Sequence, residues 1–467
     1  MRFHVLWRIL GSQALSSLGT SMSTVALAFM VNKLTGSMLH MGAVMAVSVL
    51  PLAVMSWFGG ALLDRYSSRN LMVLADAARA VLIFSMPFLA RQSVALIYVV
   101  AGLVGVFSAL FNPGQIKLVG ELTERESLIK ANSFLGVSRD GAELLGYLAG
   151  GVVVTLAGYT PAFMADAGSY VLSALLLIGL PRVARMGAGA RVAASVAPAS
   201  AEGVAGAEPG LVATPAGVTW ARPLAPPVRV RTLVAESPAV FMRLWRHPGL
   251  RTNLLLAVLP MAALMMYVPN SYGLVLDVFK GTGVDLGTLE VVVGCGLIIG
   301  GLLMSQMALA GDKNTYVLAA IVMVAFCLLG VYFSHSLWLS IGLMGAAGAL
   351  SIGMTVPSIT MIQQAAEDGG RGRLISLRTG FGQMGTMAGF LVGGALGDQL
   401  GIVRAFLVAA VAAIGFSLVI YVPYRVGAGH RAQEVWEAAM ESGERRVVAR
   451  RAAAEAAIAG RQERWPR

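Results

Sequence analysis

Residues 146–163 read GYLAGGVVVTLAGYTPAF, and residues 389–406 read GFLVGGALGDQLGIVRAF. The two stretches lie 243 positions apart, and Tyr147 of the first stands in the register of Phe390 in the second. The identical residues at that offset include six of small or aromatic type: Gly146, Gly150, Gly151, Gly158, Ala162 and Phe163 correspond to Gly389, Gly393, Gly394, Gly401, Ala405 and Phe406. Some coincidence is expected in glycine-rich segments, but six identities at one offset favour duplication of a single unit. We therefore expect two halves with the same fold.

The composition indicates that both halves lie in a membrane. Of the 467 residues, 57% are hydrophobic and only 13% are charged, and the mean hydropathy is +0.74. A soluble domain carries about 25% charged residues, because polar side chains must cover its water-facing surface. A soluble enzyme or nucleic-acid-binding domain is therefore excluded. The expected surroundings are a lipid bilayer, and nucleic acid is not expected as a partner.

Twelve apolar runs are long enough to cross a bilayer core of about 30 Å, which takes roughly 20 helical residues. They lie at 9–31, 40–63, 70–90, 94–118, 131–156, 161–181, 252–276, 287–309, 315–333, 337–362, 374–398 and 402–424. We predict an all-α membrane protein with twelve transmembrane helices in two pseudo-symmetric six-helix bundles. The bundles span residues 1–181 and 249–424, joined by a linker at 182–248 and followed by a tail at 425–467.

The linker is rich in Ala, Gly, Pro and Arg and lacks sustained periodicity, so we expect most of it to be disordered. Its last part differs. Ser237 and Pro238 can begin a helix, and Phe241 and Trp245 then recur at helical spacing beside arginines, which predicts a short interfacial helix near 238–246.

Positive charge predicts the orientation, because loops rich in Lys and Arg stay in the cytoplasm. With both termini in the cytoplasm, the outward loops hold only four of the 35 basic residues, namely Lys33, Arg91, Lys280 and Arg404. We predict a multi-pass protein of a prokaryotic plasma (inner) membrane, with the linker and the tail also cytoplasmic. Most of the net charge of +11 then lies on the cytoplasmic side.

The turn after the second apolar run carries a recognisable charged motif. Residues 59–70 read GGALLDRYSSRN, in which Gly60, Asp64, Arg65 and Arg69 match the Gly-x-x-x-Asp-Arg-x-Gly-Arg-Arg signature of the major facilitator superfamily. Ser67 and Ser68 stand where that signature has Gly and Arg. The resemblance implies a cytoplasmic latch that pairs charges between the halves in one conformation. A plain solvated turn is the alternative.

A second motif lies in the fifth apolar run. Gly146, Gly150 and Gly151 resemble the Gly-Pro-x-x-Gly-Gly motif of drug and proton antiporters in that superfamily, with Tyr147 in place of the Pro. Asp76, Arg79 and the stretches 113–132 and 162–167 are also similar to the branch that includes macrolide and siderophore exporters. The glycines would serve helix packing equally well.

Charged residues inside apolar runs are costly in lipid and call for a reason. Arg139, Asp140 and Glu143 lie about 12 to 18 Å inside the fifth helix, at about 1.5 Å per residue. One carboxylate can neutralise the arginine, and a low-dielectric site then favours protonation of the other. A proton carrier and a permanently paired structural triad are both consistent with this spacing. Asp76 and Asp166 lie nearer the membrane faces and are the next candidates for proton coupling.

The sequence offers no support for ATP use, a metal centre or a cofactor. It lacks a Gly-x-x-x-x-Gly-Lys-Ser/Thr loop, and its five histidines show no metal-ligand spacing. In the superfamily, the first, fourth, seventh and tenth helices line the central pathway. On these helices the candidate cavity residues are Gln13, Ser17, Ser21, Thr24, Phe111, Asn112, Met261, Met265, Tyr267, Asn270, Met354 and Thr355.

These observations predict a secondary transporter and not an enzyme. Its substrate would be a small amphipathic compound, because Met and aromatic side chains suit poorly specified apolar ligands. The resemblance implies export in exchange for protons by alternating access, with the halves rocking about a central site. We expect a monomer. The alternatives are a lysophospholipid or lipid flippase of the same fold and a non-transporting sensor or assembly protein that keeps the fold.

Overall fold

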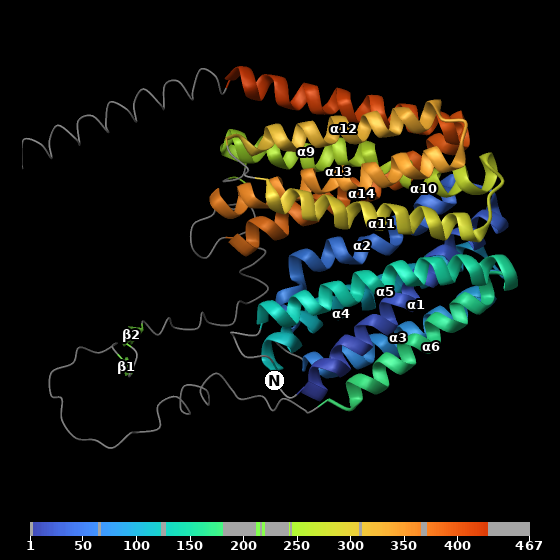
Figure 1. Ribbon diagram of the computed structural model, residues 1–467, viewed down its shortest axis with the longest axis vertical. Helices are drawn as coiled ribbons and strands as arrows, with labels where there is room; N and C mark the ends of the chain where they lie inside the picture. The colour runs from blue at the N-terminus through green and yellow to red at the C-terminus, as the bar shows by residue number, and fades with distance from the viewer. Residues whose placement is uncertain are drawn as a thin grey trace, which may run out of the picture.

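The computed structural model describes residues 3–63, 67–122, 128–180, 212–214, 217–219, 242, 245–307, 311–365 and 371–427. Nearly all of these residues are helical, and long helices run alongside one another in two bundles (Figure 1). Helices satisfy their own backbone N–H and C=O groups, which lipid cannot do. The predicted fold class, an all-α membrane protein of two pseudo-symmetric bundles, is confirmed.

The N-terminal bundle consists of six helices, one for each predicted apolar run. They are α1 (Phe3–Thr35), α2 (Met38–Leu63), α3 (Ser68–Leu89), α4 (Val94–Leu122), α5 (Leu128–Ala157) and α6 (Tyr159–Ile178). Gly158 joins α5 to α6 at a φ of 79°, and its counterpart Gly401 has a φ of 93°. Both values lie in the left-handed region that glycine adopts without a steric penalty, so this pair of the repeat serves a tight turn.

The C-terminal bundle follows the same plan with one interruption. It contains α9 (Pro248–Met265), α10 (Tyr267–Gly273), the π-helical turn η2 (Leu274–Val278), α11 (Gly283–Gln306), α12 (Lys313–Phe333), α13 (Leu337–Ala365), α14 (Arg371–Leu400) and a last helix, Ile402–Gly427. The predicted run 252–276 is thus divided into α9, α10 and η2, although Pro248–Val278 is still apolar enough to form one membrane span.

Eleven of the helices in the described part of the chain are long and apolar enough to cross a membrane, and α14 is the twelfth by its place in the fold. With 30 residues it is about 45 Å long, which is sufficient to span. It is less apolar because it contains Arg371, Arg373, Arg378 and Asp398 as well as many glycines, some of which lie on the face that packs on α9. A Cβ added at Gly389 would lie 2.3 Å from the carbonyl oxygen of Ala262, so a larger apolar residue has no room there.

Within the predicted linker, two short strands pair antiparallel: β1 (Val212–Thr214) and β2 (Gly217–Thr219), with Val212 opposite Thr219. Their Val and Thr residues favour extended backbone. The remainder of the linker, its predicted disorder and the tail 425–467 beyond residue 427 lie outside the described residues. Of the predicted interfacial helix near 238–246, the described residues Met242, Trp245 and Arg246 are helical and exposed.

Apolar and polar side chains are arranged as expected for a protein in lipid. On α3, Val81, Phe84 and Phe88 are exposed, whereas Asp76 and Arg79 of the same helix are buried. Large apolar side chains on the outside are a liability in water but are favourable against acyl chains. The charged groups of α3 therefore face the interior of the N-terminal bundle.

The sequence repeat corresponds to equivalent packing in the two bundles. A Cβ at Gly146 of α5 would lie 2.3 Å from the carbonyl oxygen of Leu18 on α1, just as one at Gly389 of α14 would meet Ala262 on α9. Phe163 and Phe406 are both fully buried. The duplicated glycines thus let α5 and α14 approach the first helix of their own bundle closely.

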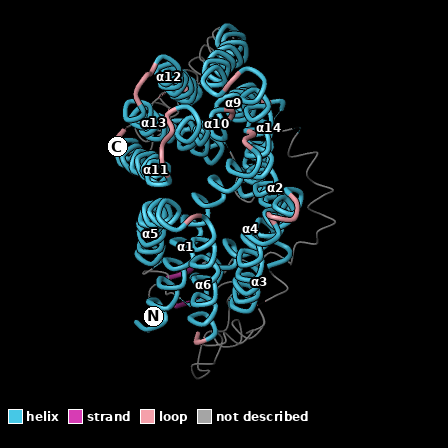
Figure 2. The backbone as a smooth tube through the Cα atoms, turned by 90° about the vertical axis from the view of Figure 1, so that its right-hand side faces the viewer, coloured by secondary structure: helices cyan, strands magenta, loops and turns pink. Residues whose placement is uncertain are grey.

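The bundles contact each other through two helix pairs, α2 with α14 and α5 with α11, on either side of a central gap between the tubes (Figure 2). We call the end where α1 begins and Ile402–Gly427 finishes the terminal end, and the other the opposite end. Backbones touch near the opposite end, where a Cβ at Gly394 would lie 2.3 Å from the carbonyl oxygen of Met38. At the second helix pair, a Cβ added at Gly151 would lie 2.5 Å from the carbonyl oxygen of Gly283.

Hydrogen bonds join the bundles at this same opposite end. Asp398, near the end of α14, accepts bonds from the N–H groups of Met38 (2.6 Å) and Leu39 (3.2 Å) at the start of α2. At the position 243 residues earlier, Thr155 of α5 accepts a bond of 3.1 Å from the N–H of Val284 at the start of α11. Each half therefore caps a helix of the other half, which satisfies donors that a helix leaves free at its first turn.

Candidate functional site

Of the cavities toward the terminal end, two lie at equivalent places within the bundles, one in each. The N-terminal cavity, of about 160 Å³, is lined by Gln13, Gln115, Asn132, Leu135, Gly136 and Arg139, from α1, α4 and α5. The C-terminal cavity, of about 170 Å³, is lined by Leu256, Ala257, Met261, Val317, Met354, Thr355, Ser358, Arg378, Thr379, Gly382, Gln383 and Thr386, from α9, α12, α13 and α14.

The two cavities occupy equivalent places in the repeat. At the offset of 243, five of the six residues of the N-terminal cavity correspond to residues of the C-terminal one: Gln13 to Leu256, Gln115 to Ser358, Leu135 to Arg378, Gly136 to Thr379 and Arg139 to Gly382. The duplication has therefore kept the hollow in both halves. The side chains that line the hollow differ between the halves: Leu256 replaces Gln13, Arg378 replaces Leu135, and Gly382 replaces Arg139.

The N-terminal cavity has an arginine accompanied by two carboxylates. Arg139 pairs with Asp140 at 2.9 Å between Nη2 and Oδ1, and its Nε lies 3.7 Å from Oε1 of Glu143. The side chains of Arg139, Asp140 and Glu143 are 53%, 43% and 39% exposed, so the surrounding protein does not enclose them. Asp140 holds the arginine more closely, which leaves Glu143 as the weaker-bound carboxylate.

The C-terminal cavity has an arginine that the sequence analysis did not single out. The Nε of Arg378 donates to Oγ of Ser358 at 3.1 Å, and that hydroxyl donates in turn to Oδ1 of Asn253 at 2.7 Å. Asn253 donates to Asn314 (3.1 Å), and Asn314 donates to the carbonyl of Gly249 (3.1 Å). This chain of bonds connects α14, α13, α9 and α12, so Ser358, the direct partner of Arg378, is itself held by residues of other helices.

A second residue missed by the sequence analysis is Glu290 on α11. Tyr272 of α10 donates its hydroxyl to Oε1 of Glu290 at 2.5 Å. Tyr147 of α5 lies within electrostatic reach of Glu290 and Glu143 and is hydrogen-bonded to Ser21 of α1. Glu290 therefore lies where the two bundles meet, between the N-terminal cavity and the closed opposite end.

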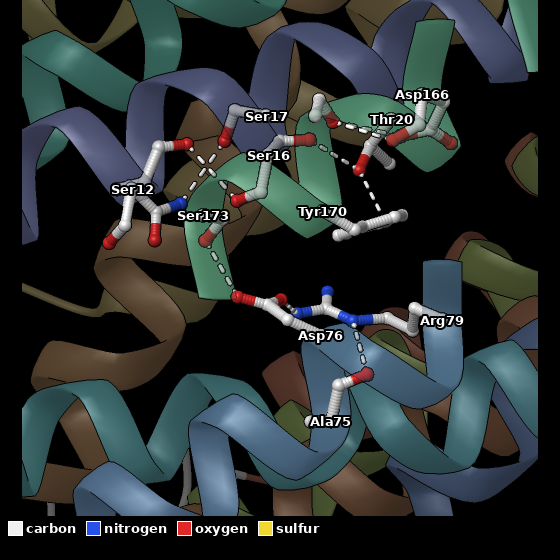
Figure 3. Close-up of polar contacts among 12 residues, drawn as sticks. Ser12, Ser16, Ser17, Thr20, Ala75, Asp76, Arg79, Asp166, Tyr170 and Ser173 are labelled. Carbon is white, nitrogen blue, oxygen red and sulfur yellow. Dashed lines mark hydrogen bonds and ion pairs between the residues drawn. The ribbon is translucent and has the colours of Figure 1, made fainter. Parts of the chain in front are cut away.

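Asp76, Arg79 and Asp166 form a network inside the N-terminal bundle, shown in Figure 3. Arg79 is ion-paired with Asp76, and Ser173 donates to Oδ2 of Asp76 at 2.6 Å. The guanidinium lies 4.4 Å from the ring centres of both Phe111 and Tyr170. The guanidinium of Arg79 is therefore in contact with a carboxylate and two aromatic rings. These contacts hold α3 against α6 and α4.

Asp166 lies above this network on α6, fully buried against α1. Ser169 donates to its Oδ1 at 3.4 Å, while Oδ2 is buried without a hydrogen bond among the described residues. Thr20 of α1 shares a hydrogen bond of 2.7 Å with the Tyr170 hydroxyl (Figure 3). Asp76 and Asp166 are fully buried, whereas the side chain of Glu143 is 39% exposed and lies near Arg139, which lines the N-terminal cavity. Glu143 is therefore better placed to exchange protons with water.

Four of the predicted cavity residues line the two cavities, namely Gln13, Met261, Met354 and Thr355. Ser17 is beside them and accepts a bond of 3.1 Å from Gln13. Ser21 contacts Tyr147 as described above, and Thr24 bonds back to its own helix at the carbonyl of Thr20.

The other predicted cavity residues lie elsewhere. Phe111 is buried against Arg79 in the bundle interior. Met265 packs where Gly389 approaches α9, and Tyr267 contacts Phe406 with ring centres 6.3 Å apart. Asn270 is fully buried and donates to the carbonyl of Gly393 at 2.7 Å. The side chain of Asn112 lies outside the described residues.

The charged turn after α2 can be followed only in part. Asp64 and Arg65 lie outside the described residues, and Gly60 lies within α2. Arg69 donates from Nε to the carbonyl of Leu177 at 3.0 Å and also bonds that of Ile178, at the end of α6. An arginine at the last carbonyl groups of a helix satisfies their free acceptors, and its positive charge interacts favourably with the negative end of the helix dipole. In this conformation Arg69 thus joins two helices of one bundle.

Comparison with known proteins is consistent with this arrangement. The sequence profile of the Major Facilitator Superfamily matches residues 9–309 and 274–458. Over 178 residues, 38% of this chain and 42% of the relative, the chain is 29% identical to the uncharacterized MFS-type transporter YfiS of Bacillus subtilis. Over 142 residues, 29% of this chain and 32% of the relative, it is 30% identical to the lysophospholipid transporter LplT of Yersinia pestis.

These two alignments thus cover less than half the length of either relative. Among solved structures, the nucleoside transporter NupG superposes with a TM-score of 0.66 at 14% identity, over 91% of this chain and 99% of that one. At such low identity the likeness concerns the fold alone.

Proposed function

The chain belongs to the Major Facilitator Superfamily, and from that premise we propose that it exports a small amphipathic compound from the cytoplasm in exchange for protons. The observation that carries the proposal is the contrast between the two ends. The bundles are in backbone contact at the opposite end, and each bundle keeps a cavity toward the terminal end. This is the geometry of one state of an alternating-access transporter, in which the halves rock about a central site.

We place the terminal end in the cytoplasm. The outward loops then hold four of the 35 basic residues, which agrees with the retention of positive loops on the cytoplasmic side. The state described here is then inward-facing, with both cavities accessible for loading. We further propose that one chain suffices, because it contains both halves of the pathway, and that it transports its substrate without modifying it.

Proton coupling is assigned to Glu143. Asp140 is the closer partner of Arg139, at 2.9 Å against 3.7 Å, so it neutralises the arginine and leaves Glu143 free to bind and release a proton. Glu143→Gln should keep gradient-free exchange of substrate and lose accumulation against a gradient. Asp140→Asn should mainly lower stability, because it weakens the pairing of Arg139.

A lysophospholipid or lipid flippase is the second candidate, favoured by the partial similarity to LplT. Such a protein would move a single-chain lipid across the bilayer and need not depend on a proton gradient. The C-terminal cavity is compatible with it, since Leu256, Met261, Val317 and Met354 line that cavity together with polar groups.

The test is uptake by inverted membrane vesicles under an imposed pH gradient, with a panel of amphipathic compounds and labelled lysophospholipids. Uptake that requires the gradient and is lost in Glu143→Gln supports proton-coupled export. Movement of lysophospholipid without a gradient supports the flippase instead. Absence of movement of any probe, with normal insertion, contradicts both candidates and leaves a sensor or assembly role.

A further inference from the structure

We propose that Arg378 binds the headgroup of the substrate, and that the transported compound is a single-chain amphiphile with an anionic phosphate or carboxylate. This inference rests on the proposed transport function and adds the substrate class to it. Its basis is the charge balance, hydrogen bonding and lining of the C-terminal cavity.

The charge of Arg378 is not balanced within its cavity. The twelve lining residues include no carboxylate, and no ion pair of Arg378 is found in the described part of the chain. An arginine inside a membrane-spanning helix is costly unless it has a counter-charge or a functional reason. Seven residues into α14, or about 10 Å from its start, Arg378 also lies beyond the charged headgroup layer at the helix end. An anionic ligand would supply the missing charge.

The guanidinium is oriented before any ligand arrives. One of its five N–H donors is bonded to Ser358, which Asn253 and Asn314 hold in turn from two further helices. This bond restrains the side chain at Nε, and no hydrogen bond of its terminal NH2 groups is found in the described part of the chain, so these donors are available to a ligand in the cavity that Arg378 lines. Two parallel N–H donors match the oxygens of a carboxylate or phosphate, and a pre-oriented fork loses little entropy on binding.

The rest of the lining fits a molecule with a polar head and an apolar chain. Thr355, Thr379, Gln383 and Thr386 offer hydroxyl and amide groups for a headgroup. Leu256, Met261, Val317 and Met354 offer apolar contacts, and Met adapts to chains of variable shape. The cavity of about 170 Å³ holds only part of such a ligand, so the chain would extend into the space between the bundles.

The N-terminal cavity does not offer a second anion site. The residue equivalent to Arg378 there is Leu135, and the nearby Arg139 is paired with Asp140 and lies near Glu143. Asp140 and Glu143 do not line that cavity, but both lie against its arginine and place negative charge beside it, which disfavours an anion there. The headgroup is therefore assigned to the C-terminal half alone.

The experiment is equilibrium binding of radiolabelled lysophosphatidylglycerol to the purified full-length protein in an uncharged maltoside detergent. The competitors are the monoacylglycerol of the same chain length, an alkyltrimethylammonium of that length, and inorganic phosphate. The parent should bind the anionic lipid at least about tenfold more tightly than the uncharged or cationic one, as expected for a charge-assisted hydrogen bond. Inorganic phosphate should compete poorly, because it lacks the apolar chain.

Three variants complete the test. Arg378→Gln should remove the preference for the anionic lipid, and Arg378→Lys should keep part of it as a point charge. Arg404→Gln, the matched control, removes the same charge from an exposed position outside the cavity and should bind like the parent. Ser358→Ala, which frees the guanidinium without removing it, should weaken binding less than Arg378→Gln, and gel filtration verifies that all variants are folded.

The proposal is overturned if the parent shows no anionic preference, if Arg378→Gln keeps it, or if inorganic phosphate competes as well as the lipid. These outcomes are separable from failure of the proposed function. Binding with the expected preference but without transport in vesicles would refute export and leave the site intact. Transport of uncharged or cationic compounds unaffected by Arg378→Gln would refute the site and leave export intact.

Discussion

The two cavities have the same position in a duplicated fold and opposite charge balance. In the N-terminal half Arg139 is accompanied by Asp140 and Glu143, whereas in the C-terminal half Arg378 is held by the neutral Ser358. Backbone packing was retained in both halves, as the equivalent environments of Gly146 and Gly389 show. The comparison teaches that duplication supplied the scaffold and its hollows, while each half acquired its own chemistry. On our account the N-terminal half handles the proton and the C-terminal half handles the anion.

The largest effect should come from adding a methyl group where the bundles touch. Gly151→Ala and Gly394→Ala each place a Cβ within 2.5 Å of a backbone carbonyl of the other bundle. Overpacking of this kind costs roughly 1–3 kcal/mol, so each change should open the opposite end and strongly reduce transport. Accessibility of single cysteines introduced at that end is the measurement.

The control for this pair is Gly141→Ala on α5, whose added Cβ would meet nothing within 4 Å. It should transport like the parent. Similar losses in the two interface variants would support equivalent roles of the halves in closing the opposite end. Normal accessibility in both would contradict the described interface.

The next effect concerns the stability of the two arginines. Arg139→Gln leaves two carboxylates without their counter-charge, whereas Arg378→Gln leaves no acid behind in its cavity. The first should lower stability by roughly 1 kcal/mol, since these half-exposed groups are partly screened. The second should leave it equal or higher, because it removes an unbalanced charge. Thermal unfolding of the purified variants measures the difference, and equal losses would mean that the charge balance of the cavities is not as described.

A smaller effect is expected from the two caps between the bundles. The charged carboxylate of Asp398 accepts hydrogen bonds from the N–H groups of Met38 and Leu39. The neutral hydroxyl of Thr155 accepts one bond, from the N–H of Val284. Losing a helix cap costs about 1 kcal/mol. Asp398→Asn and Thr155→Val should therefore both shift the protein toward an open opposite end, with the larger shift in Asp398→Asn. The accessibility of cysteines at the opposite end measures both shifts. If the shift in Thr155→Val is equal to or larger than that in Asp398→Asn, the charge of Asp398 does not explain the strength of its cap.

The smallest effect should come from the connection between the halves. Deleting residues 190–230 removes a segment whose composition can bury no core, and both cavities lie outside it. Transport should be retained when the deletion protein inserts normally. By contrast, Trp245→Glu should reduce activity more, because a charge replaces an apolar anchor at the membrane surface. Loss of transport in the deletion alone would assign the linker a role.

The fold could be predicted from the sequence because its signals are repeated and local. Twelve apolar runs set the helices, and the glycines at the offset of 243 marked where helices approach closely. The division of the seventh span at Met266 was missed, although Pro269 marks it, because a proline has no N–H to donate to the carbonyl of Met265. The reason for a glycine at position 389 is visible only in three dimensions, namely the carbonyl of Ala262 that faces it.

The site was predicted less well because side-chain chemistry depends on which helix faces meet. The cluster of Arg139 with two acids was detected from its spacing along one helix. Arg378 and Glu290 were missed because each is a lone charge whose partners, Ser358 and Tyr272, lie on other helices. Phe111 was assigned to the pathway by its place on α4, yet its ring faces Arg79 inside the bundle.

The most direct test of the division between the halves uses proteoliposomes that contain the parent, Glu143→Gln or Arg378→Gln, with an anionic single-chain amphiphile as substrate. Two quantities are measured for each protein: accumulation driven by a pH gradient, and the half-saturating substrate concentration in gradient-free exchange. The account predicts that Glu143→Gln loses accumulation at an unchanged half-saturating concentration. It predicts that Arg378→Gln raises that concentration at least about tenfold and still accumulates substrate at saturation. If both variants change the same quantity to the same extent, the two cavities do not divide the work and the account is wrong.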